Sequence, residues 1–273
     1  MRRIKLTVAY DGTRYCGWQV QPNGITVQEV LNKALSDLTG EDIRTTGASR
    51  TDSGVHARGN VAVFETNVRM PAERFAFALN TYLPEDIRIQ GSEEVSETFH
   101  PRFTSTVKTY EYRILHRTFP DPTRRLDCLF CYDELDVEAM KAALSVLVGT
   151  HDFKSFQGAG GEASTHTTIR TLYQAEILTE PLEEIYYPVT DTGNRNFRRT
   201  GEYLLRIRLT GNGFLYNMVR IIAGTLLDIG RGHRKAEEMK AILEAMNREA
   251  AGPTAPACGL TLLSIRYPEW EKT

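Results

Sequence analysis

The order of strand-like and helix-like segments near the start of the chain is the feature that most limits its fold. Residues 4–10 alternate apolar and polar side chains, which is the pattern of a half-buried strand. Thr26 and Glu29 then form a capping box at the start of an amphipathic helix, and Gly40 follows the last residues of its apolar face. This order predicts a strand and a helix that pack their apolar faces together.

A second strand-helix-strand series follows directly. Residues 43–46 and 61–64 are strand-like, and Pro71 opens a second amphipathic helix before another strand begins at 87–89. The complete order is β-α-β-β-α-β, which is typical of ferredoxin-like folds.

The second half of the chain repeats this order loosely in structure but not in sequence. Its expected elements are a strand at 110–114, a helix at 137–148, strands at 171–178 and 203–209, helices at 215–228 and 236–246, and a strand at 260–267. Residues 180–201 have no period and many turn-forming residues, so we expect a long loop or an irregular hairpin there. The sequence predicts an α+β protein of two ferredoxin-like domains, 1–105 and 106–273, whose antiparallel sheets form a central cleft.

The composition of this 273-residue chain gives no global sign of its partner, because the formal charge is −2 and the pI about 6.3. A nucleic-acid function therefore depends on local clusters of Arg and Lys. No apolar run reaches the roughly 18 residues needed to span a bilayer, and the basic N-terminus turns polar too early for a secretory signal. We therefore expect a cytoplasmic protein that does not bind membranes.

The cysteines do not indicate a metal site. Cys128 and Cys131 form one C-x-x-C pair, but no second Cys or His pair has the spacing of a zinc site. In their strand-like context we interpret them as reduced core thiols. We expect neither a metal nor a cofactor.

The stretch GASRTDSGVHARGNVAVF, residues 47–64, places one carboxylate in a Gly-rich loop with several cations. Asp52 follows Arg50 and precedes His56 and Arg58. Glycines let a backbone approach a ligand closely, and arginines suit a phosphate or carboxylate partner. A carboxylate among cations stays ionised and can act as a nucleophile. The alternative is a Gly-rich turn that Asp caps and Arg solvates.

Arg220 is the only charged residue between positions 209 and 227, in a segment that predicts an apolar helix. A guanidinium on such a helix is costly to bury unless it is paired. It either lies at the polar edge and reaches solvent or pairs with a carboxylate of the other domain. Asp52 is the best candidate partner, and the pairing would lower the pKa of Asp52 and hold it in a bidentate contact.

Lys108, Tyr110 and Tyr112 share one face of a predicted strand, because residues two apart in a strand point the same way. One interpretation is that both aromatic rings pack in a core. The lysine on the same face instead suggests an open, basic surface. On such a surface a tyrosine ring can stack on a base flipped out of an RNA helix.

The octapeptide RTDSGVHA, residues 50–57, resembles the active-site motif of the tRNA pseudouridine synthase A family. The resemblance extends over nearly the whole chain in the right order. The other matching segments lie at 10–13, 15–19, 27–29, 99–103, 108–112, 214–224, 259–260 and 267–268.

The resemblance implies an isomerase that converts uridine to pseudouridine, by breaking the N1–C1′ bond and joining C5 to C1′. In such an enzyme Asp52 is the nucleophile, Arg220 its partner and Tyr110 the active-site tyrosine, whereas Tyr112 is structural. Tyr110 would stack on the base and assist removal of the C5 proton. The chemistry requires no metal, nucleotide or redox cofactor.

The implied substrate is tRNA, at uridines 38, 39 and 40 of the anticodon stem-loop, and the implied assembly is a homodimer. Arg50 and Arg58 are expected to hold the flipped nucleotide through phosphate, although Arg58 is equally consistent with a plain surface residue. His56 and Lys108, with Tyr110, complete the predicted substrate-binding set.

Two other functions remain open from the residues alone. A hydrolase or nuclease would use Asp52 and His56 as acid and base, but the second acidic residue that a metal nuclease needs is absent near Asp52. A non-catalytic RNA-binding module built on paired ferredoxin-like sheets would not require the isolated Arg220.

Overall fold

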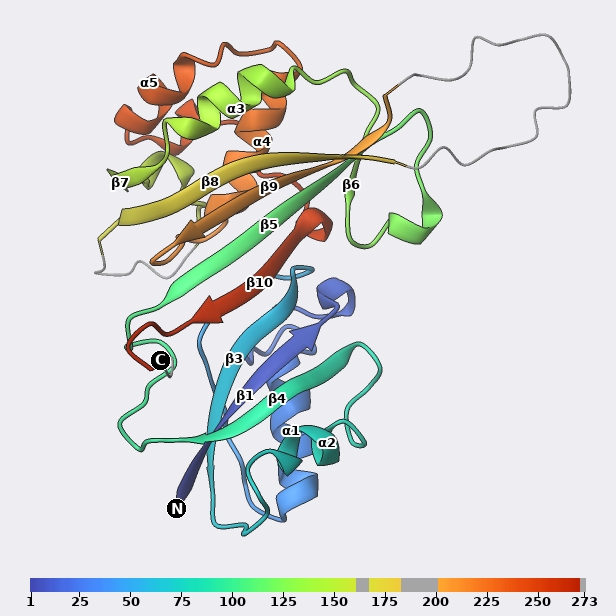
Figure 1. Cartoon of the computed structure of the whole chain (residues 1–273), viewed down its shortest axis with the longest axis vertical. Helices are drawn as coiled ribbons and strands as arrows, with labels where there is room; N and C mark the ends of the chain where they lie inside the picture. Colours follow the sequence, from blue (N-terminus) through green and yellow to red (C-terminus); the bar gives the residue numbers. More distant parts are fainter. Residues whose placement is uncertain (161–166, 183–200, 271–273) are drawn as a thin grey trace, which may run out of the picture.

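One mixed sheet organises the part of the chain that this computed structural model describes, residues 1–160, 167–182 and 201–270. The strands are β1 (Arg2–Tyr10), β2 (Thr46–Gly47), β3 (His56–Thr66), β4 (Ile87–Val95), β5 (Val107–His116), β6 (Leu129–Cys131), β7 (Gly149–Asp152), β8 (Ile169–Pro181), β9 (Tyr203–Gly211) and β10 (Leu260–Arg266). The helices are α1 (Val27–Thr39), α2 (Arg74–Leu79), α3 (Val137–Ser145), α4 (Met218–Gly230) and α5 (Glu238–Glu244). The main path of the sheet runs β4-β1-β3-β10-β5-β9-β8-β7 (Figure 1).

The first half of the chain has the ferredoxin-like order that the sequence predicts. Its strands lie in the order β4-β1-β3-β2, and all three pairs are antiparallel. The ends of α1 are also as predicted. The Thr26 hydroxyl accepts a hydrogen bond from the Glu29 amide at 3.3 Å, and Gly40 ends the helix with φ 71°.

The second half repeats the same order. Its strands β5, β8, β9 and β10 lie in the order β10-β5-β9-β8, with α3 before β8 and α4 before β10. Helix α4 contacts β5 and α3 contacts β8, so the helices of this half pack on its own strands (Figure 1). The loose structural repeat expected from the sequence is therefore present.

Strand β10 joins the two halves, which the sequence analysis did not foresee. The short β2 pairs only with Ala62 and Val63 of β3, so the beginning of β3 is left available. There His56 and Ala57 pair in parallel with β10, whose other edge pairs antiparallel with β5. The halves thus share one sheet rather than two separate antiparallel ones.

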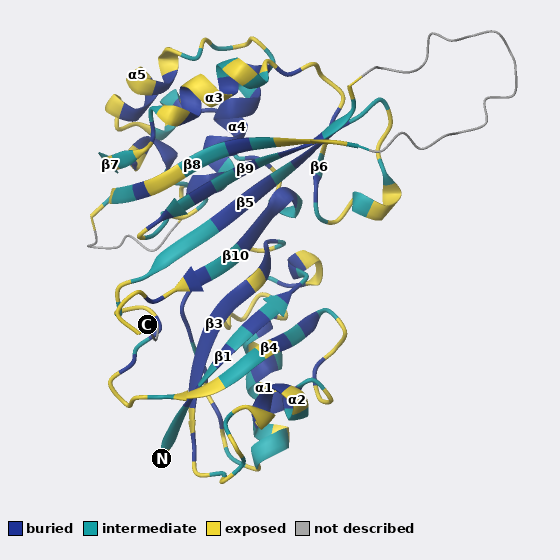
Figure 2. Cartoon of the chain, viewed as in Figure 1, coloured by how far each residue is buried: buried dark blue, intermediate teal, exposed yellow. Residues whose placement is uncertain are grey.

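Burial follows this arrangement. Buried residues run along the central strands β3, β10 and β5 (Figure 2). Most buried apolar side chains of both halves belong to one connected cluster, and Leu115, Cys128 and Leu204 form a second, small one. The predicted boundary between residues 105 and 106 falls in the connection between β4 and β5. The division into two domains stays a prediction.

The segment 180–201 is only partly covered by the structure. Strand β8 continues to Pro181, and residues 183–200 lie outside the described part. Within the described ranges, no helix has both the length and the apolar character needed to cross a membrane.

Helix α4 is the central apolar helix of the second half. Of its residues only Arg220 and Asp228 are not buried. Gly224 lies directly against the segment that precedes β10, because a Cβ at Gly224 would lie 1.9 Å from the carbonyl oxygen of Pro253. This close approach fixes how near α4, and with it Arg220, lies to the segment that precedes β10.

We therefore expect Gly224→Ala to destabilise the protein by about 1–3 kcal/mol through overpacking. At an open helical site the same change would stabilise the protein by about 1 kcal/mol. Gly91→Ala in strand β4 is the control for a glycine without crowding, since a Cβ at Gly91 meets no atom within 4 Å. Thermal and urea unfolding measure both. An unchanged or raised melting temperature for Gly224→Ala would contradict the close-packing interpretation.

Candidate active site

Asp52 and Arg220 meet between the two halves of the chain. The Asp52 loop precedes β3, whereas Arg220 lies in the first turn of α4, and Oδ2 of Asp52 is 3.6 Å from Nη1 of Arg220. The two side chains are 18% and 17% exposed, respectively. The predicted pairing is therefore found. The predicted bidentate geometry is wrong in this structure, because the shortest contact is longer than an ordinary hydrogen bond.

The pKa of Asp52 moves in the opposite direction from the one expected. Burial raises the pKa of this carboxyl above its usual value, and the nearby Arg220 charge offsets only part of the effect. The lowered pKa predicted from the sequence follows from the partner charge alone, whereas the loss of hydration depends on the assembled fold. Burial disfavours the charged form, and here it outweighs one cation at 3.6 Å.

Arg220 is held in place by groups other than Asp52. Its Nε donates to the carbonyl of Ala255 at 2.7 Å, and its Nη1 donates to Oδ1 of Asn217 at 2.9 Å. Asn217 itself has a left-handed backbone with φ 59°, a conformation that asparagine tolerates. The hydroxyl of Tyr112 donates to the next carbonyl, that of Pro256, at 2.8 Å. The guanidinium is thus fixed before any substrate arrives.

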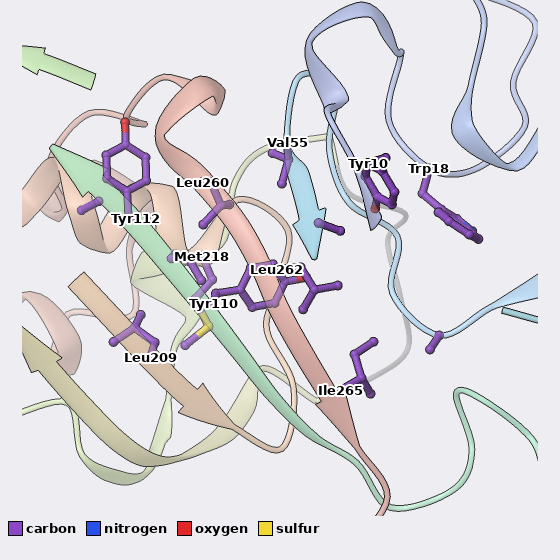
Figure 3. Packing of buried hydrophobic residues seen from close by; sticks show 14 of the residues in the cluster. Tyr10, Trp18, Val55, Tyr110, Tyr112, Leu209, Met218, Leu260, Leu262 and Ile265 are labelled. Carbon is purple, nitrogen blue, oxygen red and sulfur yellow. The ribbon is translucent and has the colours of Figure 1, made fainter. Parts of the chain in front are cut away.

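Tyr110 is buried at the junction of β5 and β10, where Figure 3 shows it beside Leu262. It is 7% exposed, and its ring meets that of Phe214 edge-to-face at 5.0 Å. The expectation of an open surface around Tyr110 is therefore wrong. Burial, and to a smaller extent the charge of Asp52, raises the pKa of Tyr110 to about 12, although a hydrogen bond with Ser49 opposes the shift.

Two side chains of strand β5 form hydrogen bonds with the loop that carries Asp52. The hydroxyls of Tyr110 and Ser49 lie 2.8 Å apart, and Nζ of Lys108 donates to the carbonyl of Ala48 at 3.0 Å. Lys108 is half-buried, and burial together with the charges of nearby arginines lowers its pKa to about 8. Two side chains on one face of a strand in the second half thus fix a loop of the first half.

A buried polar network below this loop was missed by the sequence analysis. Nδ2 of Asn60 donates to the Ser49 carbonyl at 3.0 Å and to the Tyr10 hydroxyl at 3.2 Å. The Tyr10 hydroxyl in turn lies 2.7 Å from the Thr51 hydroxyl. The available signal was Asn60, a polar residue next to an apolar run in β3, because a buried amide must find partners.

The other predicted site residues divide into two groups. Both ring nitrogens of the buried His56 have protein partners: Nδ1 lies 3.1 Å from the Gly12 amide and from Oδ1 of Asp11, and Nε2 lies 3.2 Å from the Cys258 carbonyl. These contacts favour a structural role for His56. Arg50 and Arg58 are exposed, and their predicted phosphate contacts remain a prediction.

The site contains groups that could serve nucleophilic (covalent) catalysis: one half-buried carboxylate, one fixed cation and one buried phenol. Among the residues that the structure describes, no three His, Cys, Asp or Glu side chains are grouped in a way that could hold a metal ion.

Comparison with known proteins identifies the family. Residues 6–104 and 143–268 match the family profile described as tRNA pseudouridine synthase. The chain belongs to the tRNA pseudouridine synthase family. The profile covers both the Asp52 loop and the helix of Arg220, and its gap includes the segment around β6.

Individual members of this family resemble the chain over its full length. Proteins named tRNA pseudouridine synthase A from Thermoanaerobacter sp. (strain X514) and Citrifermentans bemidjiense are 44% and 42% identical to it, over 98% of this chain and 100% and 99% of theirs. A solved structure of a Cbf5-Nop10-Gar1 complex aligns at 11% identity with a TM-score of 0.30, over 95% of this chain and 47% of that one. That likeness is too weak to support an argument.

We expect Arg220→Gln to raise the pKa of Asp52 further, because it removes the cation that opposes the effect of burial. Arg220→Lys is the matched control, since it keeps the charge, and should give a smaller shift. Carboxyl-carbon NMR titration of the two variants and of the unaltered protein measures the pKa directly. An identical Asp52 titration in Arg220→Gln would show that the pair is not electrostatically coupled.

Proposed function

We propose that this chain converts uridine to pseudouridine at positions 38, 39 and 40 of the tRNA anticodon stem-loop, with Asp52 as the nucleophile. Its family is that of isomerases acting on tRNA uridine. The observation that carries the proposal is the half-buried Asp52–Arg220 pair between the two halves of the sheet. It is the arrangement expected when one carboxylate must be kept ionised away from bulk water.

The reaction breaks the N1–C1′ bond of uridine and joins C5 of the same base to C1′. No atom is lost and nothing is oxidised, so the protein must supply a nucleophile, a grip on the detached uracil and exclusion of water. Asp52 can attack either C1′ or C6 of the base. Arg220 favours the ionised carboxylate that both routes require.

Tyr110 contributes as a neutral phenol. Because its pKa is raised to about 12, the phenolate is scarce at neutral pH, and the tyrosine is a poor base in the free protein. The Phe214 ring meets that of Tyr110 edge-to-face and Tyr110 is 7% exposed, so a base can stack on Tyr110 only after neighbouring side chains move. We infer that stacking on the base, rather than proton removal, is the first task of Tyr110.

Three adjacent target positions require recognition by shape and backbone rather than by sequence. A paired uridine must also leave its stack, at a cost of a few kcal/mol. The exposed Arg50 and Arg58 are proposed to hold the phosphates of the flipped nucleotide. A homodimer in the cytoplasm completes the proposal, and these two points rest on the family resemblance.

The decisive experiment incubates unmodified tRNA with protein in the presence of EDTA and analyses the nucleosides. We expect pseudouridine from the unaltered protein and none from Asp52→Asn, since an amide is not a competent nucleophile. Both proteins should bind the tRNA. Cleaved tRNA would indicate a hydrolase, and tRNA binding without any product would indicate an RNA-binding module. If Asp52→Asn formed pseudouridine in a single turnover at a rate within tenfold of that of the unaltered protein, Asp52 would be excluded as the nucleophile.

The stability of Asp52→Asn serves as the control for folding. The folded-state pKa of Asp52 is raised above its unfolded value, so ionised Asp52 opposes folding at neutral pH, and stability grows as pH falls through the folded pKa. A neutral amide should therefore leave the melting temperature at pH 7 unchanged or higher. A clearly lower melting temperature would attribute the lost activity to misfolding.

We expect Tyr110→Phe to retain tRNA affinity and most turnover, because the ring stays and the hydroxyl is already bonded to Ser49. Tyr110→Ala should lose both. Tyr112→Phe is the matched control on the same strand face: it removes the bond to the Pro256 carbonyl and should reduce stability rather than chemistry. Loss of turnover in Tyr110→Phe by about 10²–10⁴-fold would instead assign the hydroxyl to proton transfer.

A further inference from the structure

Three cations, Lys108 and the two arginines whose charges act on it, have no acidic partner in the described ranges. They are Lys108 in β5, Arg102 in the turn that follows β4, and Arg170 in β8. The two guanidiniums lie close enough to Lys108 for their charges to lower its pKa, and burial without a carboxylate lowers that of Arg170. We call these three residues the cation cluster.

Other cations of the same sheet are paired. Arg208 lies 2.8 Å from Glu111, and Lys5 and Arg3 each pair with a glutamate of a neighbouring strand. Lys108, Arg102 and Arg170 differ from these three cations in having no carboxylate within ion-pair distance in the described part of the chain. Lys108 and Arg170 are half-buried, whereas Arg102 is exposed. Half-buried cations without a partner cost free energy, and such groups are usually neutralised by a partner or ligand.

The cation cluster extends from the surface to the buried tyrosine. Lys108 lies two residues from Tyr110 on the same strand face. Arg170 lies along Gly213, since a Cβ there would be 3.5 Å from its Nε, and the next residue is Phe214, whose ring touches Tyr110. An anion bound here would therefore lie next to a base held against Tyr110.

The donors of the cluster are partly free for a ligand. Lys108 uses one of its three N–H groups on Ala48, and Arg170 uses Nη1 on the carbonyls of Thr167 and Ile169. Arginine forks match the oxygens of phosphate groups particularly well.

We propose that Lys108, Arg102 and Arg170 bind a phosphodiester of the RNA strand that carries the target uridine. This proposal rests on the proposed function, because it takes RNA as the substrate. An exposed aromatic residue supports RNA over a free phosphate. Phe103, 82% exposed, stacks on His100 at 4.1 Å, and the Arg102 guanidinium lies 5.9 Å from its ring. Cations interleaved with an exposed ring are typical of single-stranded RNA binding.

Phosphate binding by this cluster has a thermodynamic signature. In the free protein the pKa of Lys108 is about 8, and a bound anion must raise it, so binding takes up a proton above pH 8. Affinity should therefore fall as pH rises, by about tenfold between pH 7 and pH 9 if the bound lysine stays protonated. An arginine at the same position stays charged throughout and should abolish this dependence.

The test measures the affinity of unmodified tRNA in an Asp52→Asn background, as a function of salt and pH. We expect Arg102→Ala and Arg170→Ala each to flatten the slope of log K against log salt by roughly 0.7–0.9. Lys108→Arg should keep the affinity at pH 7 and lose the fall toward pH 9. Lys33→Ala, which removes an exposed cation paired with Asp37, is the control and should change neither.

The proposal would be overturned if the plots of log K against log salt for Arg102→Ala and Arg170→Ala had the same slope as that of the parent protein. It would also be overturned if the affinity of Lys108→Arg still fell with pH as in the parent protein. Competition with inorganic phosphate distinguishes an RNA phosphodiester from free phosphate as the ligand of the cation cluster. At matched ionic strength phosphate should compete no better than chloride, and competition that Arg170→Ala abolishes would assign the cluster to free phosphate instead. Cluster-dependent tRNA binding without pseudouridine from the unaltered protein would overturn the proposed function and leave the RNA site standing.

Discussion

The pairing of β10 with both halves of the chain is the interaction on which the site depends. Its Leu262 lies opposite Ala57 of β3 on one edge and opposite Tyr110 of β5 on the other. This last strand lies between β3 and β5, and so brings the Asp52 loop next to the face of β5 that carries Tyr110. Contacts between segments this far apart in sequence form late and slowly, so we expect the site to be completed at the end of folding.

Burial in the site disfavours the charged forms of its ionisable groups. Burial raises the pKa of Asp52, lowers that of Lys108 and raises that of Tyr110, so each group is moved toward its neutral form. Arg220 alone opposes this trend at Asp52. Such perturbed groups persist when the surrounding structure fixes them, and here Ala255 and the network around Asn60 do so. If Asp52 is the proposed nucleophile, the stability given up locally is the expected cost of its reactivity.

The sequence predicted what local physics determines. The ends of α1 follow from Thr26 and Gly40, and Arg220 was identified because an unpaired charge on an apolar helix needs a partner. The parallel β3–β10 pair could not be predicted, since no local pattern encodes which distant strand fills a free edge. The direction of the Asp52 pKa was wrong for the same reason, because burial is a property of the assembled fold.

In the proposed function, Lys108 would connect RNA binding to the placement of Asp52. One of its N–H groups holds the Ala48 carbonyl, and Tyr110 on the same face holds Ser49, so β5 fixes the loop before Asp52 at two points. Above pH 8, where the free lysine is mostly neutral, a phosphate on the remaining donors of Lys108 would restore its charge, and a charged donor makes the stronger hydrogen bond to a carbonyl. Under those conditions, binding of the RNA backbone would tighten the loop that carries Asp52.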